Sequence, residues 1–392
     1  MLTSIGVIII SAILLGRVCD MVRLPRLVAM LLIGVVFGPY VLDIISGDLL
    51  GISAELREIA LVIILARAGL SLSVGELKKV GRPAVLMSFL PASFEIAGYT
   101  IFASLILNIS IVDAMLIGSI MGAVSPAVVV PRMIKIKEEG YGEDKGVASI
   151  IMSASSVDDV YVIVLFSAFL TLSGGGEFSF AVLASVPIAI AVGIAVGIAV
   201  GIAFSQLIKK VHMRDSVKVL LLLSIAFMLL GVEDAIENTI PFSALISIVT
   251  FGVIISTNQP ERAKRLSNKF SKLWIFAEIM LFVLVGAIVD ISYASQNALA
   301  VIAVIAIAMC FRMLGAFLAT LKTPLNIKER LFCMLAFTPK ATVQAAIGGI
   351  ALAQGLAIGN LALSFAVIGI LLSAPIGAVM IDFSYKKLLH KD

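Results

Sequence analysis

The sequence predicts an all-α polytopic membrane protein of about 13 transmembrane helices, arranged as two inverted six-helix repeats with one discontinuous helix in each. Three observations lead to this fold class. The 392-residue chain is 61% hydrophobic and only 14% charged, with a mean hydropathy of +1.15. Apolar runs of roughly 17–25 residues, long enough to cross a bilayer, recur along its whole length. Two of these runs, the fifth and the twelfth, are expected to be interrupted at a proline, Pro126 and Pro339.

The composition excludes a soluble globular protein, because a soluble domain of this size could not bury so much apolar surface. The cysteines, Cys19, Cys310 and Cys333, are odd in number and irregularly spaced, which predicts free thiols rather than disulfides or a zinc site. The two histidines, His212 and His390, fall near loop ends. We therefore expect no metal cluster, no cofactor and no nucleic-acid partner.

The expected helices follow from the apolar runs taken in order. They cover residues 2–18, 26–45, 54–71, 84–107, 112–134, 147–172, 180–208, 216–233, 240–256, 271–290, 297–321, 328–354 and 361–385. No stretch between them is polar enough to form a soluble domain, so residues 1–392 are predicted to be one transmembrane domain. The repeats are expected at about 1–172 and 216–385, with the helix at about 180–208 as a linker between them.

The expected linker helix has a glycine at every fourth position, namely Gly193, Gly197 and Gly201. Small residues at this spacing allow two helices to approach closely in a membrane. We interpret the stripe as a packing surface rather than a ligand site.

The connections between the spans are alternately rich in basic residues and in acidic residues, and this alternation predicts the orientation of the chain. All but four of the 29 lysines and arginines fall in the odd-numbered connections and the C-terminal tail. The third connection has Lys78, Lys79 and Arg82, and the ninth has Arg262, Lys264, Arg265, Lys269 and Lys272. The even-numbered connections carry mainly acidic residues, such as Asp43, Asp48 and Glu177. The positive-inside rule then places the N-terminus outside and the C-terminus in the cytoplasm, in a cytoplasmic (inner) membrane.

Several charged residues fall inside the expected spans rather than between them. The four basic residues left over are Arg57, expected at the outer interface, and the intramembrane residues Arg67, Arg312 and Lys340. The intramembrane acids are Glu95, Asp158, Asp159 and Glu278. A charge at this depth costs several kcal/mol unless it is paired or hydrated. These residues therefore predict a polar interior.

Two spans are expected to be interrupted, the fifth at Ser125-Pro126 and the twelfth at Thr338-Pro339-Lys340. Proline removes a backbone donor and clashes with the preceding turn, and Ser125 is expected to satisfy a freed backbone group. An ordinary kink would explain either proline alone. The twelfth span, however, lies seven positions after the fifth and crosses the membrane in the opposite direction. Broken helices at corresponding positions of inverted repeats indicate a transporter binding site, where Lys340 is expected to offset the carbonyl ends of half-helices.

Two adjacent carboxylates, Asp158 and Asp159, lie near the middle of the sixth span. Neighbouring helix residues point about 100° apart, so both can border one cavity without facing each other. Burial and mutual repulsion favour the protonated form of at least one of them. Such a carboxylate binds either a proton or a hard cation, which is the chemistry that exchanging the two ions requires. Further oxygens are expected from Ser125, Ser155, Ser156 and Thr338.

Two other interpretations of the aspartates were weighed. A helix-capping or salt-bridged pair with no transport role is disfavoured because no loop is near. An intramembrane aspartyl protease needs two aspartates that face one another across a water, usually from separate helices. Adjacent residues on one helix cannot do so, and we therefore do not expect an enzyme.

At these residues the chain resembles the monovalent cation/proton antiporter superfamily, specifically sodium/proton antiporters with a paired-aspartate motif. The similar segments are ILARAGLSLSVGELKKVG (64–81), LPASFEIAG (90–98), GAVSPAVVVP (122–131), SSVDDV (155–160) and TPKATVQAAIG (338–348). The resemblance covers nearly the whole chain. It implies the sodium/proton antiporter fold, with two crossed discontinuous helices.

The resemblance also implies roles for residues and domains. Asp159 would be the main carrier of Na⁺ (or Li⁺) and the proton, with Asp158 as its coupled partner and second metal ligand. A core subdomain would comprise about 84–172 and 297–385 and move in an elevator-like manner against a dimerisation domain. The protein would then be a homodimer in the lipid bilayer.

The chain departs from the family pattern at two places. Many paired-aspartate members have a lysine on the helix corresponding to 297–321, where this chain has Arg312, which can pair but cannot release its proton. Glu95 is the best candidate to neutralise Arg312, a pairing that resembles the animal-type subgroup. Ser125 also stands before Pro126 where other branches have an aspartate.

The sequence leaves other functions open. A potassium/proton antiporter or potassium-efflux protein of the same fold is the main alternative to exchange of Na⁺ or Li⁺ for protons. A sodium-coupled symporter would need a larger substrate pocket, for which one Trp and six Tyr are available. A passive channel would not need a titrating pair.

Overall fold

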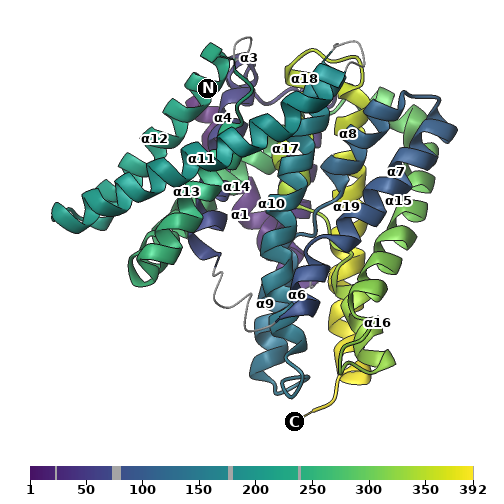
Figure 1. Ribbon diagram of the computed structural model, residues 1–392. Helices are drawn as coiled ribbons and strands as arrows, with labels where there is room; N and C mark the ends of the chain where they lie inside the picture. The colour runs from purple at the N-terminus through teal and green to yellow at the C-terminus, as the bar shows by residue number, and fades with distance from the viewer. Residues whose placement is uncertain (23, 73–80, 175–179, 237–239, 392) are drawn as a thin grey trace. The chain divides into compact units, whose positions relative to one another are not determined.

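The computed structural model describes residues 1–22, 24–72, 81–174, 180–236 and 240–391, with the backbone alone for 180–187. These residues are helical nearly throughout, as predicted (Figure 1). In this part of the chain nine helices are long and apolar enough to cross a bilayer, and three shorter apolar helices accompany them. The expected loop residues Lys78, Lys79 and Glu177 lie outside the described residues.

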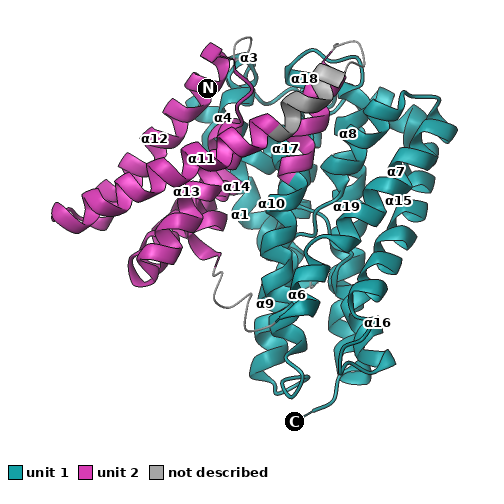
Figure 2. Ribbon diagram, in the orientation of Figure 1, with its two compact units in different colours: residues 1–57, 77–162, 279–392 teal, residues 58–76, 163–278 magenta. Residues whose placement is uncertain are grey.

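The chain divides into two compact units (Figure 2). Unit 1 comprises residues 1–57, 77–162 and 279–392, and unit 2 comprises 58–76 and 163–278. Three helices continue from one unit into the other: α4 (Ser53–Ser71), α10 (Val147–Ser173) and α14 (Pro260–Ala287).

Unit 1 contains most of the helices. Besides its parts of α4, α10 and α14, these are α1 (Leu2–Met21), α2 (Arg26–Phe37), α3 (Gly47–Gly51), α6 (Arg82–Met87), α7 (Leu90–Leu107), α8 (Ile111–Met121), α9 (Pro126–Glu138), α15 (Ile291–Ala319), α16 (Ile327–Ala336), α17 (Thr342–Ile347), α18 (Ile350–Ala353) and α19 (Gly359–Leu388).

Two long helices of unit 1, α7 and α15, lie side by side (Figure 1). Their backbones come so close that a Cβ atom on Gly315 would lie 2.7 Å from the Leu90 carbonyl oxygen. Glycine is therefore required at this position. The close packing sets Glu95 of α7 and Arg312 of α15 within reach of each other.

Several predicted spans are shorter or more broken than expected. The span expected at 26–45 ends at Phe37, because Gly38 precedes Pro39 and adopts extended backbone (φ −68°, ψ 173°). The span expected at 84–107 is divided into α6 and α7, with Pro91 in the first turn of α7. The interruptions expected in the fifth and twelfth spans are confirmed, since non-helical residues separate α8 from α9 and α16 from α17.

Unit 2 consists of the rest of α4, α10 and α14 together with three further helices. These are α11 (Phe180–Lys210), α12 (Asp215–Ile236) and α13 (Ala244–Asn258). The glycine stripe of α11 packs against α13: a Cβ atom on Gly197 would lie 2.6 Å from the Ser247 carbonyl oxygen. The structural interpretation of the stripe is thereby confirmed.

The predicted start of α14, at residue 271, is wrong. The helix begins at Pro260, a residue suited to a first helical turn, so the basic residues Arg262 to Lys272 lie on a helix rather than in a loop. Ala263, Leu266, Phe270 and Trp274 recur at helical spacing and are buried. This segment is amphipathic rather than uniformly apolar, and a search for apolar runs therefore missed it.

Arg57, which was expected at the outer interface, has a buried side chain. Its side chain is only 7% exposed, and its Nε donates to the Ser53 carbonyl oxygen at 3.1 Å. A Cβ atom on Gly349 would collide with the guanidinium. Arg57 is therefore packed against the end of α17 within unit 1.

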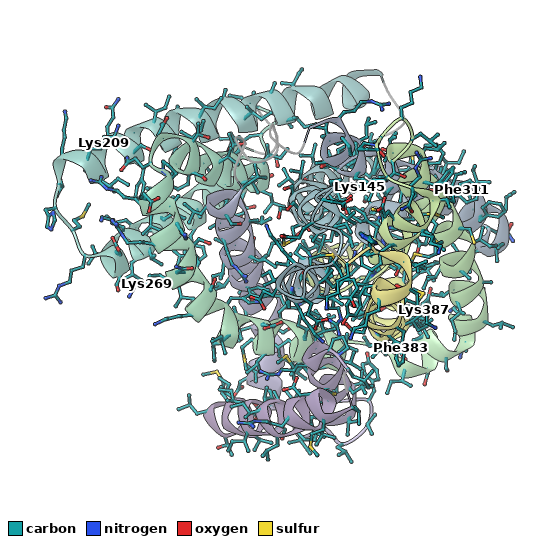
Figure 3. The ribbon with its side chains drawn as sticks, turned by 90° about the horizontal axis from the view of Figure 1, so that it is seen from below. Lys145, Lys209, Lys269, Phe311, Phe383 and Lys387 are labelled. Atoms are coloured by element: carbon teal, nitrogen blue, oxygen red, sulfur yellow. The ribbon has the colours of Figure 1, made fainter. Side chains whose placement is uncertain are left out.

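The last turns of α19 show the change from an apolar to a basic surface. Phe383 is 68% exposed, and Lys387 follows it by one helical turn on the same side (Figure 3). An exposed aromatic followed by a lysine is typical of a helix that leaves the apolar part of a bilayer.

Candidate functional site

The two interrupted helices of unit 1 meet at their breaks. Residues 122–125 separate α8 from α9, and residues 337–341 separate α16 from α17. The Ser125 backbone N–H donates to the Pro339 carbonyl oxygen at 2.8 Å, which joins one break to the other. Each break frees backbone groups that need partners away from water.

Side chains from other helices satisfy the freed groups of the first break. Arg312 donates to the Gly122 carbonyl oxygen, and Gln344 Nε2 donates to the Ala123 carbonyl oxygen at 2.9 Å. The Val124 N–H donates to Asp158 Oδ2 at 2.7 Å. Ser125 was expected to have this role. Its hydroxyl instead is buried and has no hydrogen-bond partner among the described residues.

Arg312 is the central cation of the site and is fully buried. Its guanidinium binds Glu95 Oε2 at 2.6 Å and Asp158 Oδ2 at 3.0 Å. It also donates to the carbonyl oxygens of Gly122 and Phe337, which follow the last turns of α8 and α16. Helix C-termini carry partial negative charge, so one arginine binds two carboxylates and the ends of two half-helices.

Lys340 lies in the second break, also fully buried, and its Nζ is 2.5 Å from Glu95 Oε2. Its backbone N–H donates to Ser373 Oγ of α19 at 3.0 Å. The hydrogen bonds to the carbonyl ends come from Arg312, while Lys340 Nζ binds Glu95. Arginine has five N–H donors in a planar fork and can reach several acceptors at once, whereas lysine acts as a point charge.

The two adjacent aspartates have different surroundings. Asp158 is fully buried and shares one oxygen between Arg312 and the Val124 N–H. Asp159 is 6% exposed, and among the described residues it makes no ion pair. One oxygen of each, Oδ1, is buried without a hydrogen-bond partner in the described part of the chain. Asp158 is therefore held by a cation, while Asp159 is not.

Two of the predicted hydroxyl groups, Ser155 and Ser156, lie on α10 with the aspartates, and Thr338 lies in the second break. Ser155 and Ser156 both donate to the Met152 carbonyl oxygen, at 3.0 and 3.2 Å, and they lie one turn before Asp159 on α10. Thr338 donates to the Leu335 carbonyl oxygen at 2.8 Å. A hydroxyl that donates its proton keeps its lone pairs free for a cation.

The sequence prediction missed Gln344, which is fully buried and whose Nε2 also donates to the Ile120 carbonyl oxygen at 3.3 Å. It missed Thr342 as well, whose buried hydroxyl has no partner among the described residues. Both were detectable as polar residues inside a predicted span. Neither residue is charged, and neither stands beside a proline or an aspartate, the features that mark the predicted site residues.

Comparison with known proteins gives three findings. The family described as "Sodium/hydrogen exchanger, transmembrane" matches residues 7–387. Sodium/hydrogen exchanger 9B2 of Xenopus tropicalis is 30% identical over 409 residues, which is 100% of this chain and 75% of the relative. Sodium/hydrogen exchanger 9B1 of Homo sapiens is 30% identical over 410 residues, which is 100% of this chain and 78% of the relative.

Solved structures are similar as well, among them that of the sodium proton antiporter MjNhaP1 from Methanocaldococcus jannaschii at pH 8. It superposes with a TM-score of 0.84 at 22% sequence identity, covering 99% of this chain and 98% of that one. The two proteins therefore share a fold, which confirms the predicted all-helical antiporter fold but not the predicted number of 13 helices.

Proposed function

The chain belongs to the sodium/hydrogen exchanger family of cation/proton antiporters, and from that membership we propose that it exchanges Na⁺ or Li⁺ for protons, with Asp159 as the group for which the two ions compete. Members of this family are membrane transporters rather than enzymes. Asp158 would then be the ion-paired neighbour that keeps a negative charge beside the exchanging carboxylate.

The balance of buried charges is the observation that carries this proposal. Arg312 and Lys340 are matched by Glu95 and Asp158, and these four side chains are joined by contacts of 2.5–3.0 Å. An ionised Asp159 would add one uncompensated negative charge in a region of low dielectric, which is costly. A proton or a monovalent cation removes that cost, and binding of one displaces the other.

The available ligand atoms suit a small hard cation. Asp159 Oδ1, Asp158 Oδ1 and Ser125 Oγ are buried oxygens without partners among the described residues. Ser155 and Ser156 add hydroxyl oxygens one turn away on α10. Carboxylate and hydroxyl oxygens are the ligands that hard cations prefer, and the described residues of the site offer no sulfur or imidazole ligand.

We also propose the wider arrangement that family membership implies. In it the protein is a homodimer in the cytoplasmic membrane, and the core at about 84–172 and 297–385 carries Asp159 from one side of the membrane to the other. Inverted repeats at about 1–172 and 216–385, joined by the helix at about 180–208, would supply the two broken helices.

Reconstitution into proteoliposomes tests the function. With a preformed acid-inside pH gradient and an entrapped pH-sensitive dye, we expect Na⁺ or Li⁺ added outside to dissipate the gradient, and K⁺ to have a much smaller effect. A response to K⁺ alone would identify the potassium/proton alternative. No response to any of the three cations, when an ionophore control responds, would contradict the proposed antiport.

The proposed orientation makes a separate prediction. The Gly142 N–H donates to the His390 carbonyl oxygen at 2.8 Å, so the α9–α10 connection and the C-terminal residues lie together in unit 1. In a background without native cysteines, Glu143→Cys should react with an impermeant maleimide only after cells are opened. Asn108→Cys, in the α7–α8 connection, should react on intact cells. Labelling of both on intact cells would contradict a cytoplasmic C-terminus.

A further inference from the structure

The part of the second interrupted helix that follows the break, α17, is only six residues long. A helix this short is not stable alone, because forming its first turn costs more than its few hydrogen bonds return. Contacts with neighbouring helices must therefore hold both of its ends. Near its start, Gln344 Nε2 donates to the carbonyl oxygens of Ile120 at 3.3 Å and Ala123 at 2.9 Å. Its other end is held by a different set of contacts.

Two glycines at the end of α17 allow neighbouring groups to approach its backbone. A Cβ atom on Gly348 would collide with the Ala366 side chain of α19. A Cβ atom on Gly349 would collide with Nη1 of Arg57, which belongs to α4, and the next residue it would meet is Ile288, at 3.4 Å. The Arg57 guanidinium therefore occupies the space that a side chain at position 349 would need.

Arg57 is buried, and among the described residues no carboxylate forms an ion pair with it. Its Nε donates to the Ser53 carbonyl oxygen at 3.1 Å, one turn earlier on α4. Glu55 is the acid that acts on it electrostatically, but the Glu55 side chain is exposed. A buried charge needs compensation. The last carbonyl groups of α17 carry partial negative charge and end beside the guanidinium, so they supply part of that compensation.

The Arg57–Gly349 contact joins two parts of the chain that the proposed exchange would move apart. Gly349 belongs to the core proposed at about 84–172 and 297–385, whereas Arg57 lies outside that core, and α4 passes into unit 2 directly after it. In the proposed orientation both residues lie on the outer side of the breaks. Turning the site toward the outer side would separate the core from the start of α4, and hence break this contact.

We propose that Arg57 is a positioning residue for ion exchange: its guanidinium binds the end of α17 and favours the arrangement described here over one in which the site opens to the outer side. This inference rests on the proposed exchange and on the proposed movement of the core. The contacts of Arg57 described above include none of the proposed ion ligands, so Arg57 acts on the direction in which the site faces and not on ion binding itself. A contact present in only one of two arrangements shifts their populations by its own free energy.

Two substitutions break the contact in different ways. Arg57→Gln removes the charge. Gly349→Ala keeps the charge but places a methyl group where Nη1 lies, and the end of a flexible arginine can move away at little cost to folding. Arg132→Gln is the control for the first, since Arg132 pairs with Asp382 at 3.3 Å and both belong to the proposed core. Gly231→Ala of α12 is the control for the second, since its added Cβ would meet no described atom within 4 Å.

Na⁺-dependent exchange is measured in right-side-out and in everted membrane vesicles, which gives the half-saturating Na⁺ concentration on each side. Each value varies inversely with the population that faces that side, so the ratio of the internal to the external value reports the balance between the two arrangements. Arg57→Gln and Gly349→Ala should each raise this ratio by roughly tenfold, which corresponds to the loss of one hydrogen-bonded charge contact. Arg57→Lys, which keeps the charge, should raise it less.

The double change of Arg57 and Gly349 should raise the ratio no further than Arg57→Gln alone, because both substitutions break the same contact. The two control variants should leave the ratio unchanged. The melting temperature in detergent shows which variants are folded, and Gly349→Ala decides the question if Arg57→Gln does not fold.

An unchanged or lowered ratio in a folded variant of Arg57 or Gly349 would overturn the inference, whatever its melting temperature. An equal rise in either control, or additive effects in the double variant, would also overturn it, because the effect would then not come from this contact. Absence of Na⁺-dependent exchange in the unmodified chain would contradict the proposed function itself, and with it this role for Arg57.

Discussion

Replacing Asp159 with asparagine is expected to abolish Na⁺- and Li⁺-dependent proton flux in proteoliposomes while the protein stays folded. Asparagine keeps the shape of the side chain but neither releases a proton nor neutralises a cation. Because Asp159 makes no ion pair among the described residues, its loss leaves no partner uncompensated. The melting temperature should therefore stay within a few degrees of that of the unmodified chain.

Asp158→Asn is the matched control for this variant, since it alters the adjacent carboxylate. Asp158 binds Arg312 and the Val124 N–H, so its replacement should lower the melting temperature. Part of the exchange should survive, because Asp159 still carries one titrating charge. Near-normal Na⁺-dependent flux in Asp159→Asn, or complete loss of flux only in Asp158→Asn, would remove Asp159 from the proposed role.

Glu95→Gln and Arg312→Gln are expected to give the largest losses of stability in the site, each roughly 3–5 kcal/mol, because each leaves buried charges without their partner. Arg312→Gln should be the more severe, since it deprives two carboxylates and two half-helix ends of one cation. The double change should cost less than the two single changes together, which is the signature of a direct pair. Thermal unfolding in detergent measures all three.

A surface pair on the same unit provides the control. Arg132 and Asp382 lie 3.3 Å apart with side chains 18% and 29% exposed, so Arg132→Gln should cost only about 0–1 kcal/mol. Arg312→Lys should recover part of the loss, because lysine keeps the charge but cannot reach four acceptors. Additive losses for Glu95 and Arg312 would show that the pair is not energetically coupled.

Hydropathy predicted most of the fold, because the requirement for apolar spans acts on local sequence. The predicted helix bounds were wrong where a helix is not uniformly apolar, or where an apolar run is not helical throughout. The first turns of α14 are helical but amphipathic, and Gly38-Pro39 ends α2 inside a run that is otherwise apolar. Both interruptions occur at a proline that the sequence singled out, but Pro131 of α9 and Pro375 of α19 lie inside continuous helices, so a proline alone does not mark a break.

The sequence predicted most residues of the site, but not all of the contacts between them. The free-energy cost of placing a charge inside a membrane was enough to predict a polar interior made of Glu95, Asp158, Asp159, Arg312 and Lys340. The choice between Arg312 and Lys340 as the partner of the half-helix ends depends on where residues 122 and 337 come to lie, which is a tertiary property. Gln344 was missed because it is uncharged and stands beside neither a proline nor an aspartate, although its buried amide binds the carbonyl oxygens of Ile120 and Ala123.

The buried charge cluster also has a consequence for biogenesis. Its contacts join residues far apart in the chain: Arg312 lies 217 positions after Glu95, and Lys340 lies 245 positions after it. During synthesis the helices carrying Glu95 and Asp158 therefore enter the bilayer long before either cation is made. Until α15 and α16 follow, these carboxyl groups must stay protonated, hydrated or next to the insertion machinery. Completion of the site is thus a late step of membrane insertion, and chains that terminate before residue 312 should be targets for quality control.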